Sequence, residues 1–247
     1  MPGIGTIINV AAIIVGGFIG LLFGRFLTEK LQNAVIRALG LCVIFIGGSG
    51  ALKEMFTVEG GALSTQGTLM TIVCFALGSF LGELADFDRM IEKLGEWLKQ
   101  KSGSTNEKGF VQGFVAASVT VSVGTMAVVG PMQDVISGDI SLLMVKSLLD
   151  LIIVIVLTAS LGKGCIFSAL PVAVIQGTFS LLAKVVEPVL TEAALSNLNL
   201  TGSMLIFCIG VNLLFNTKIK VANMLPTILF AVVWAYIPFL NGNGFFA

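Results

Sequence analysis

Two side chains of opposite charge, Lys146 and Asp150, lie four residues apart inside one long apolar run. Residues at this spacing share a face of an α-helix, so the ammonium and carboxylate groups can meet. Ionisable groups at membrane depth are costly, and they mark sites for ions, protons or charged substrates. Two interpretations stay open. The pair either neutralises itself and orders a helix bundle, or Asp150 binds a cation or proton while Lys146 competes for the carboxylate or holds an anionic substrate.

The position of the pair along its helix predicts its depth in the membrane. If the helix begins near Ile140 at the membrane surface, its rise of about 1.5 Å per residue places Lys146 roughly 9 Å and Asp150 roughly 15 Å deep. The latter depth is near the middle of a hydrocarbon core about 30 Å thick. Gln176 and Asn212, in two later apolar runs, fall at a comparable depth. Each amide alone could simply bond to a neighbouring helix, but together with Asp150 they predict a polar site.

Helix-breaking residues surround these polar groups. Pro171 lies in the same apolar run as Gln176, and Pro131 precedes the charged pair. Proline removes a backbone hydrogen bond, and interrupted helices in transporters present free carbonyls and dipole ends to ions and substrates. The stretch that follows Pro131 adds three polar residues, which we expect to form an outer gate or a second ion site: Gln133, Asp134 and Asp139.

Hydroxyl side chains follow one face of the helix that precedes this stretch. Ser118, Ser122 and Thr125 recur at i, i+4 and i+7, so they point in one direction. They either line a polar path or bond back to carbonyls of their own helix. Asn9 and Asn223 lie nearer the ends of their apolar runs and are weaker candidates for the site.

The composition is that of an integral membrane protein. Of the 247 residues, 56% are hydrophobic and 11% are charged, and the mean hydropathy is +1.01, whereas a soluble domain is about a quarter charged. The formal net charge is zero, so no nucleic-acid partner is expected. The sequence contains no histidine, and its four cysteines show no CxxC pair. We therefore expect no cofactor, no metal site and no enzyme activity, because acid–base chemistry would lack its usual groups.

Apolar runs long enough to cross a bilayer predict an all-α, polytopic transmembrane bundle that forms a single domain over residues 1–247. A charged segment near residues 89–101 carries an apolar face with Met90, Leu94 and Trp97, and we expect it to lie as an interfacial helix on the lipid bilayer. The predicted spans, about eight in number, lie near residues 4–26, 34–52, 68–84, 110–130, 140–160, 165–186, 200–215 and 221–239.

The distribution of basic residues predicts that both chain ends face outward (N-out, C-out), because Lys and Arg gather in cytoplasmic connections. The connections after the first, third, fifth and seventh spans are rich in basic residues, and the alternate connections are poor in them. The first set holds Arg25, Lys30, Arg37, Arg89, Lys93, Lys99, Lys101, Lys108, Lys163, Lys218 and Lys220, and the second set holds Lys53 and Lys184.

An internal similarity and spaced glycines carry two further expectations. Segments of the first two spans (GGFIGLL and CVIFIG) resemble segments of the sixth and seventh (GTFSLL and MLIFCIG) about 160 residues later. This is either an inverted repeat, a hallmark of secondary transporters, or a chance similarity of apolar segments. Gly16, Gly20 and Gly24 let helices approach closely, either within one chain or, as the alternative, in a homodimer.

The central motif VGTMAVVGPMQDVISGDISLLMVKSLLD, followed by FSALPVAVIQGTFSLLA, LIFCIGVNLL and IKVANMLPTILFA, resembles the bacterial membrane family called domain of unknown function 554 (YqgA-like proteins). The resemblance covers nearly the whole chain. It implies a multi-span protein of the bacterial cytoplasmic (inner) membrane, of a family described as candidate transporters without a known substrate. Val135 departs from the glycine that is frequent there in the family. The family's polar signature falls on Gln133, Asp134, Gly138, Asp139, Lys146, Ser147, Asp150, Gln176, Gly177, Asn212, Asn223 and Pro226.

The leading hypothesis is a secondary carrier for an ion or small solute, cation- or proton-coupled, with a midplane site between spans 4, 5, 6 and 7. Asp150 is the expected ion or proton ligand, Lys146 is its partner, and Gln176 and Asn212 are further ligands. The alternatives are a channel with the same architecture and a membrane scaffold or sensor that transports nothing.

Overall fold

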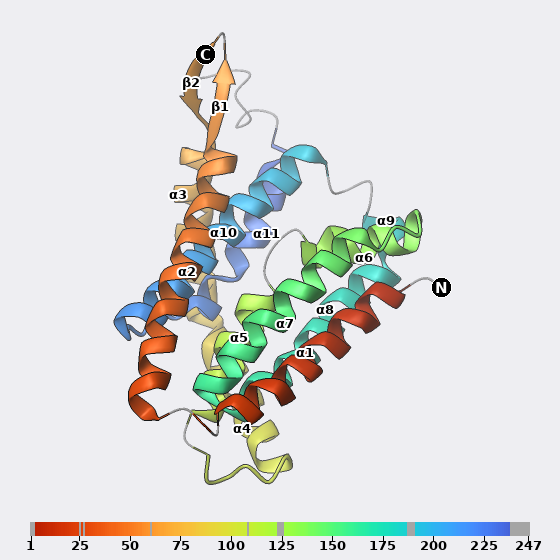
Figure 1. Ribbon diagram of the computed structural model, residues 1–247. Helices are drawn as coiled ribbons and strands as arrows, with labels where there is room; N and C mark the ends of the chain where they lie inside the picture. The colour runs from red at the N-terminus through yellow and green to blue at the C-terminus, as the bar shows by residue number, and fades with distance from the viewer. Residues whose placement is uncertain are drawn as a thin grey trace.

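The computed structural model describes residues 3–24, 26, 28–59, 61–107, 109–122, 126–186 and 191–237, and these are almost entirely helical (Figure 1). The predicted all-α class is confirmed. A small antiparallel hairpin of β1 (Phe56–Glu59) and β2 (Ala62–Thr65) was not predicted. The helices are α1 (Ile4–Gly24), α2 (Glu29–Met55), α3 (Thr68–Ala85), α4 (Phe87–Lys101), α5 (Phe110–Ser122), α6 (Met126–Ile136), α7 (Ser141–Leu161), the 3-10 helix η1 (Lys163–Ser168), α8 (Ala169–Leu181), α9 (Ala183–Val186), α10 (Glu192–Phe215), η3 (Val221–Met224) and α11 (Pro226–Trp234).

Each predicted span coincides with a helical segment. Among the described residues, six helical segments are long and apolar enough to cross a membrane. The bent pair α5–α6 would be a seventh, and the last segment, Val221–Trp234, is apolar but shorter. The locations of the spans therefore agree with the structure, while the count of eight and the orientation stay predictions.

The fourth predicted span is wrong as a continuous helix. Its two halves, α5 and α6, are bent by 55° at the break. Near the end of α5 the carbonyl oxygen of Val121 accepts a hydrogen bond of 2.7 Å from Lys146 of α7, so a side chain satisfies a carbonyl of the last turn. The second half continues past residue 130 to Ile136 and contains Gln133 and Asp134, which we expected to form an outer gate or a second ion site.

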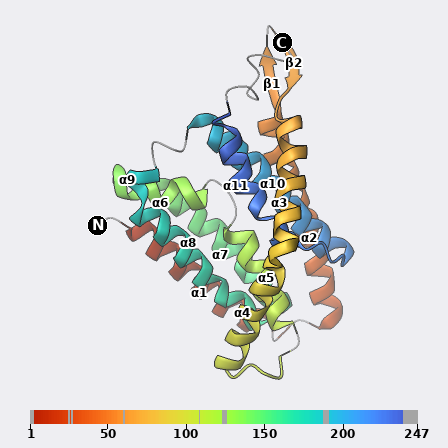
Figure 2. The ribbon, with the colours of Figure 1, turned by 180° about the vertical axis from the view of Figure 1, so that it is seen from behind.

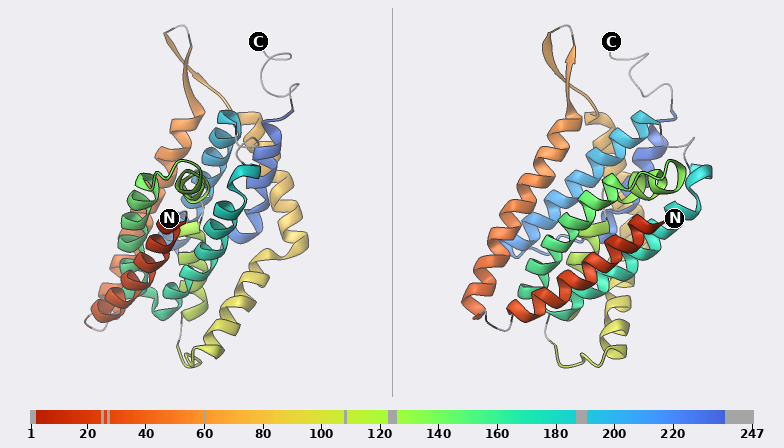
Figure 3. Two further views of the ribbon diagram at one scale, coloured as in Figure 1. Left: turned by 90° about the vertical axis from the view of Figure 1, so that its right-hand side faces the viewer. Right: turned by 45° about the vertical axis from the view of Figure 1, so that its right-hand side comes forward.

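Close packing between α1 and α7 depends on the spaced glycines. The two helices lie side by side and run parallel (Figures 1 and 3). A Cβ atom at Gly16, Gly20 or Gly24 would lie 2.7, 2.5 or 2.8 Å from a backbone carbonyl oxygen of α7. These glycines therefore serve helix packing within the chain.

A second set of helices packs beside the first. In it α2 runs antiparallel to α10, and α3 runs antiparallel to α11 (Figure 2). Gly40 of α2 approaches the backbone of α10 at Gly210, and Gly78 of α3 approaches Thr227 of α11. Each of these contacts joins one helix from the first third of the chain to one from the last third.

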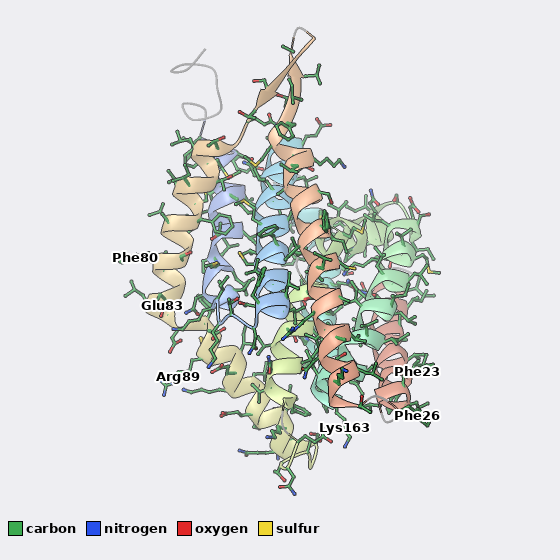
Figure 4. The ribbon with its side chains drawn as sticks, turned by 60° about the vertical axis from the view of Figure 1, so that its left-hand side comes forward. Phe23, Phe26, Phe80, Glu83, Arg89 and Lys163 are labelled. Carbon is green, nitrogen blue, oxygen red and sulfur yellow. The ribbon has the colours of Figure 1, made fainter. Side chains whose placement is uncertain are left out.

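The two ends of the bundle differ in charge. One end, which we call the basic end, contains the C-terminal end of α1, the helix α4, the α7–η1 turn and residues 216–220, and Figure 4 shows Arg89 and Lys163 there. The opposite end, which we call the hairpin end, contains β1–β2, the α6–α7 connection and α9 (Figure 3). The alternation of basic and non-basic connections in the sequence thus corresponds to two opposite ends of the fold.

Apolar side chains cover the outside of the helices. Phe23 and Phe80 are 62% and 63% exposed and project away from the bundle (Figure 4). The helix α4 is amphipathic as predicted, with Leu98 buried against α5 while Met90 and Trp97 stay exposed. An apolar outer surface on helices of this length is what a bilayer requires, so the structure is that of a membrane protein.

Replacing Gly20 by valine is expected to destabilise the bundle, because a side chain there collides with the backbone of α7. The melting temperature in detergent should fall, since overpacking typically costs about 1–3 kcal/mol. Gly177→Ala is the matched control, because nothing lies within 4 Å of a Cβ atom at that helical glycine. Equal melting temperatures for Gly20→Val and Gly177→Ala would contradict the packing described here.

Candidate functional site

The charged pair predicted from the sequence forms inside the bundle. The Lys146 Nζ atom lies 2.7 Å from Asp150 Oδ2 and 3.0 Å from Oδ1. The two side chains are only 7% and 5% exposed. Both carboxylate oxygens therefore contact one ammonium group, and the pair is shielded from solvent by the surrounding protein.

Two further helices contribute directly to this pair. From α5, the carbonyl oxygen of Val121 accepts the third hydrogen bond of Lys146. From α1, the amide nitrogen of Asn9 donates to Asp150 Oδ2 at 3.0 Å. Asn9 is fully buried. The sequence analysis ranked it as a weak candidate because it lies near the end of its span, although it shares a helical face with Gly16 and Gly20.

Gln176 of α8 lies at the same level as Asn9. Gly17 of α1 lies against Ile166 of η1, and Ile13, one turn earlier on α1, lies in one cluster with Val172, further along on α8. These two contacts together show that α1 and the η1–α8 segment run antiparallel. One helical turn further in the same direction brings Asn9 on α1 level with Gln176 on α8.

Several polar atoms around this level have no hydrogen-bond partner within the chain. Gln176 is 1% exposed, and both its Oε1 and its Nε2 atoms are unpartnered. The Oδ1 atom of Asn9 and the hydroxyl group of Ser122 are buried and unpartnered as well, and so is the hydroxyl group of Ser118, one turn further toward the basic end on α5. Buried polar groups are almost always satisfied in native proteins. These atoms therefore require water, an ion or a solute.

An apolar layer closes the site toward the basic end. It consists of Ile13, Val121, Val154, Ala169 and Val172, which pack together from four segments. On the other side of the layer, a hollow of about 500 Å³ opens at the basic end and is lined in part by Thr158 and Lys163. Thr158 lies one helical turn beyond Val154, so the apolar layer lies between the hollow and the charged pair.

Polar groups continue from the site toward the hairpin end. Thr6 lies one turn from Asn9 on α1, and Ser180 lies one turn from Gln176 on α8. The hydroxyl groups of Thr6 and Ser180 are buried and have no hydrogen-bond partner in the described part of the chain. The site is thus polar on one side and apolar on the other.

Asp134 is a buried helix cap in this structure. Its Oδ2 atom accepts a hydrogen bond of 2.8 Å from the backbone nitrogen of Gly5, and the residue is 2% exposed. Gly5 is in the first turn of α1, where unpaired N–H groups and the helix dipole favour a carboxylate. Asp134 lies where α6 packs against the start of α1, toward the hairpin end, and its role in an outer gate or a second ion site stays a prediction.

The other predicted site residues lie elsewhere. Gln133 is exposed on α6. Asp139 is also exposed, and the backbone N–H of Ser141, which bonds to its carboxylate, holds the pKa of Asp139 below its usual range. Thr125 lies outside the described residues.

Asn212 does not join the charged pair. Its amide oxygen accepts hydrogen bonds from Thr217 and from the backbone of Ile219, and its amide nitrogen donates to the carbonyl of Ile219. Asn212 therefore fixes the turn that follows α10, and the expected meeting of Asn212 with Asp150 and Gln176 is wrong in this part. The depth predicted for Asn212 was wrong, because the residue lies in the last turn of α10.

The Lys146–Asp150 pair has few titratable neighbours. The helices α1, α5 and α8 contain no titratable residue, and α6 contains only Asp134. The helix α2 also contacts α7, and its charged residues are confined to positions 29–37 and 53–54. No group of three or more His, Cys, Asp or Glu side chains in the described ranges could hold a metal ion.

Replacing Asp134 by alanine is expected to lower the melting temperature, because the first turn of α1 loses its carboxylate cap. Loss of a cap typically costs about 0.5–2 kcal/mol. Asp134→Asn should retain most of the stability, because its amide oxygen can still accept from Gly5. An Asp134→Ala protein that melts like the control Gln133→Ala, which changes an exposed side chain on the same helix, would rule out the capping role.

Comparisons with known proteins agree with the resemblance seen in the sequence. The chain is 25% identical over 233 residues to "Uncharacterized membrane protein YdfK" of Bacillus subtilis (strain 168), which covers 94% of this chain and 96% of that protein. It is 24% identical over 233 residues to "Uncharacterized protein YqgA" of Escherichia coli (strain K12), covering 93% and 94%. No solved structure matches the chain. The family described as "Protein of unknown function (DUF554)" matches residues 4–236, and the chain therefore belongs to this family.

Proposed function

We propose that this protein is a secondary carrier for an ion or small solute in the bacterial cytoplasmic membrane, with its site at the Lys146–Asp150 pair. The observation that carries the proposal is this buried pair, held by Asn9 and the end of a broken helix, beside the unpartnered amide of Gln176. Ionisable groups at membrane depth are retained where ions or charged substrates pass. In this proposal the basic end faces the cytoplasm.

The apolar layer supports a carrier rather than a channel. A carrier opens its site to one side at a time, so the site needs a closed barrier on the other side. Ile13, Val154 and Val172 supply such a barrier toward the basic end, and the buried hydroxyl groups of Thr6 and Ser180 mark a polar route toward the hairpin end. A scaffold without transport would gain nothing from this asymmetry.

The helix pairing is compatible with an inverted repeat. An inverted repeat that exchanges the first and the last three spans would pair α2 with α10 and α3 with α11, each antiparallel. Both antiparallel pairings occur. The same exchange relates the contact of α1 with α7 to the contact of η1–α8 with α5, and both contacts are present. This agreement supports the interpretation that the internal sequence similarity reflects a repeat.

The charged pair is tested by uptake into proteoliposomes, with alkali cations, inorganic anions, amino acids and carboxylic acids as probes. Wild-type protein is expected to take up at least one probe with saturation. Asp150→Asn and the double variant Lys146→Ala/Asp150→Asn should abolish uptake. The double variant removes both buried charges together, so it should stay folded on size exclusion. Asp139→Asn, which changes an exposed carboxylate, should behave like the wild type.

Two results would contradict this assignment. A folded double variant that transports like the wild type would make the pair purely structural. Wild-type uptake that rises without saturation would favour the channel, which is the second candidate because it shares this architecture.

A polar group in the apolar layer is expected to make the protein leak. Val154→Thr keeps the shape of the side chain but adds a hydroxyl group between the site and the hollow at Thr158. Non-saturable flux of the transported probe should rise, while Val233→Thr, at a lipid-exposed position of α11, should leave the flux unchanged. Val154→Thr proteoliposomes that stay as tight as the wild type would show that the layer is not the barrier.

A further inference from the structure

We infer that the site binds a monovalent alkali cation, held by the Asp150 carboxylate with the amide oxygens of Asn9 and Gln176, in exchange for one proton released from Lys146. The inference rests on the carrier function proposed above and names the ion at the same site. It depends on four features of the structure: the free oxygen atoms, the single carboxylate, the position of Lys146 and the isolation of the pair.

The free acceptor atoms at this level are oxygens. Asn9 Oδ1 and Gln176 Oε1 are buried and unpartnered, and the hydroxyl group of Ser122, next to Val121 on α5, is buried and unpartnered as well. Carboxylate, amide and hydroxyl oxygens are hard ligands, which suit alkali and alkaline-earth ions rather than transition metals. The thiol of Cys165 lies beyond the apolar layer, in the cluster with Ala117 and Leu157.

The charge of the site selects a monovalent ion. Asp150 is the one carboxylate in contact with Lys146, and no other acidic side chain bonds to the pair in the described structure. A monovalent cation on Asp150 leaves a neutral site, whereas a divalent cation would leave an uncompensated positive charge in a medium of low dielectric constant.

Lys146 occupies the place that such a cation needs. Its ammonium group contacts both oxygens of Asp150, so a cation cannot reach the carboxylate while Lys146 holds its proton there. When that proton passes to water on the hairpin side, the remaining amine can still donate to the carbonyl of Val121. The cation then takes the vacated position on the carboxylate. One positive charge leaves and one enters, so the charge of the site is unchanged.

Asn9 is suited to both states of this exchange. In the structure its amide nitrogen donates to Asp150 Oδ2, and its oxygen has no partner. A half-turn of the amide group would direct the oxygen to a cation on the same carboxylate. Gln176 needs no such rearrangement to offer a free oxygen, because neither of its amide atoms is engaged.

The titration is assigned to the pair because its surroundings contain so few other groups. Of the helices packed against this part of α7, only α6 and α2 carry titratable side chains. Asp134 of α6 bonds to Gly5, Glu54 of α2 bonds to Ser196 and Asn199, and Lys30, Arg37 and Lys53 of α2 are exposed. Glu29 and the exposed thiol of Cys42 complete the titratable residues of α2.

Binding to the purified protein tests this inference without transport. Melting temperature and isothermal calorimetry are measured in detergent with NaCl, LiCl or KCl against choline chloride at equal ionic strength, from about pH 6 to about pH 9. At least one alkali cation should raise the melting temperature, and more so at high pH. Its affinity should rise about tenfold for each pH unit, because one proton leaves for each cation bound.

Variants identify the ligands. Gln176→Leu, which removes only the amide group, should weaken cation binding at least tenfold, and Asn9→Leu should do the same. Lys146→Met should bind the cation with an affinity that no longer depends on pH. Thr227→Val is the control, because it removes a buried, unpartnered hydroxyl group on α11, which packs against α3 and α10. The Thr227→Val protein should bind the cation like the wild type.

The outcomes separate this inference from the carrier function. Folded wild-type protein that no alkali cation stabilises, or that binds a cation equally well at every pH, would overturn the exchange, even if another solute is transported. Unchanged cation binding by Gln176→Leu would remove that ligand. Cation binding with proton release, but no flux of any probe, would keep the site and contradict the carrier.

Discussion

The structure depends on the neutralisation of one buried positive charge by one buried negative charge. An unpaired ammonium or carboxylate group in this interior would be strongly unfavourable, and removing one member of a buried pair costs about 3–5 kcal/mol. Lys146 and Asp150 avoid this cost because their spacing on α7 lets them form an ion pair, but the pair alone leaves a donor of Lys146 and an acceptor of Asp150 unused. The carbonyl of Val121 accepts from Lys146, and the amide nitrogen of Asn9 donates to Asp150. The pair therefore links three helices, α1, α5 and α7, through its own hydrogen bonds.

The hydrogen bond from Asn9 to Asp150 also requires that α1 and α7 approach each other closely. Asn9 is a short side chain, so it reaches Asp150 only if the axes of α1 and α7 are near each other. Gly16, Gly20 and Gly24 allow this approach over three successive turns. The polar contact and the glycine contacts thus act together, since the glycines bring the backbones close and the Asn9 hydrogen bond fixes the register. In a bilayer, where apolar burial does not drive helix association, both kinds of contact are needed.

Much of this fold could be predicted from the sequence, and the failures have physical causes. Apolar run length located the helical segments that lie at the predicted spans, and the spacing of Lys146 and Asp150 predicted their contact. The break after α5 was missed as a bend because the residues around Gly124 are apolar enough to continue a span. Asn212 was misplaced because the end of its helix was not located closely enough to show that it lies in the last turn of α10, and the contact of Asp134 with Gly5 could not be predicted because nothing local shows that α6 packs against the start of α1. Asn9 was undervalued because its partner is 141 residues away.

A structural role and a functional role for the pair are not exclusive alternatives. A purely structural pair would be best served by complete satisfaction of every polar atom nearby, because each unsatisfied group costs about 1–3 kcal/mol. Here the charged atoms are satisfied, but the amide of Gln176 one helix away is not. An apolar residue at position 176 would fill that space at lower cost. Gln176 and the Oδ1 atom of Asn9 thus leave unpartnered polar atoms beside an ion pair whose own atoms are satisfied. This is the arrangement that the proposed exchange of one bound charge for another requires.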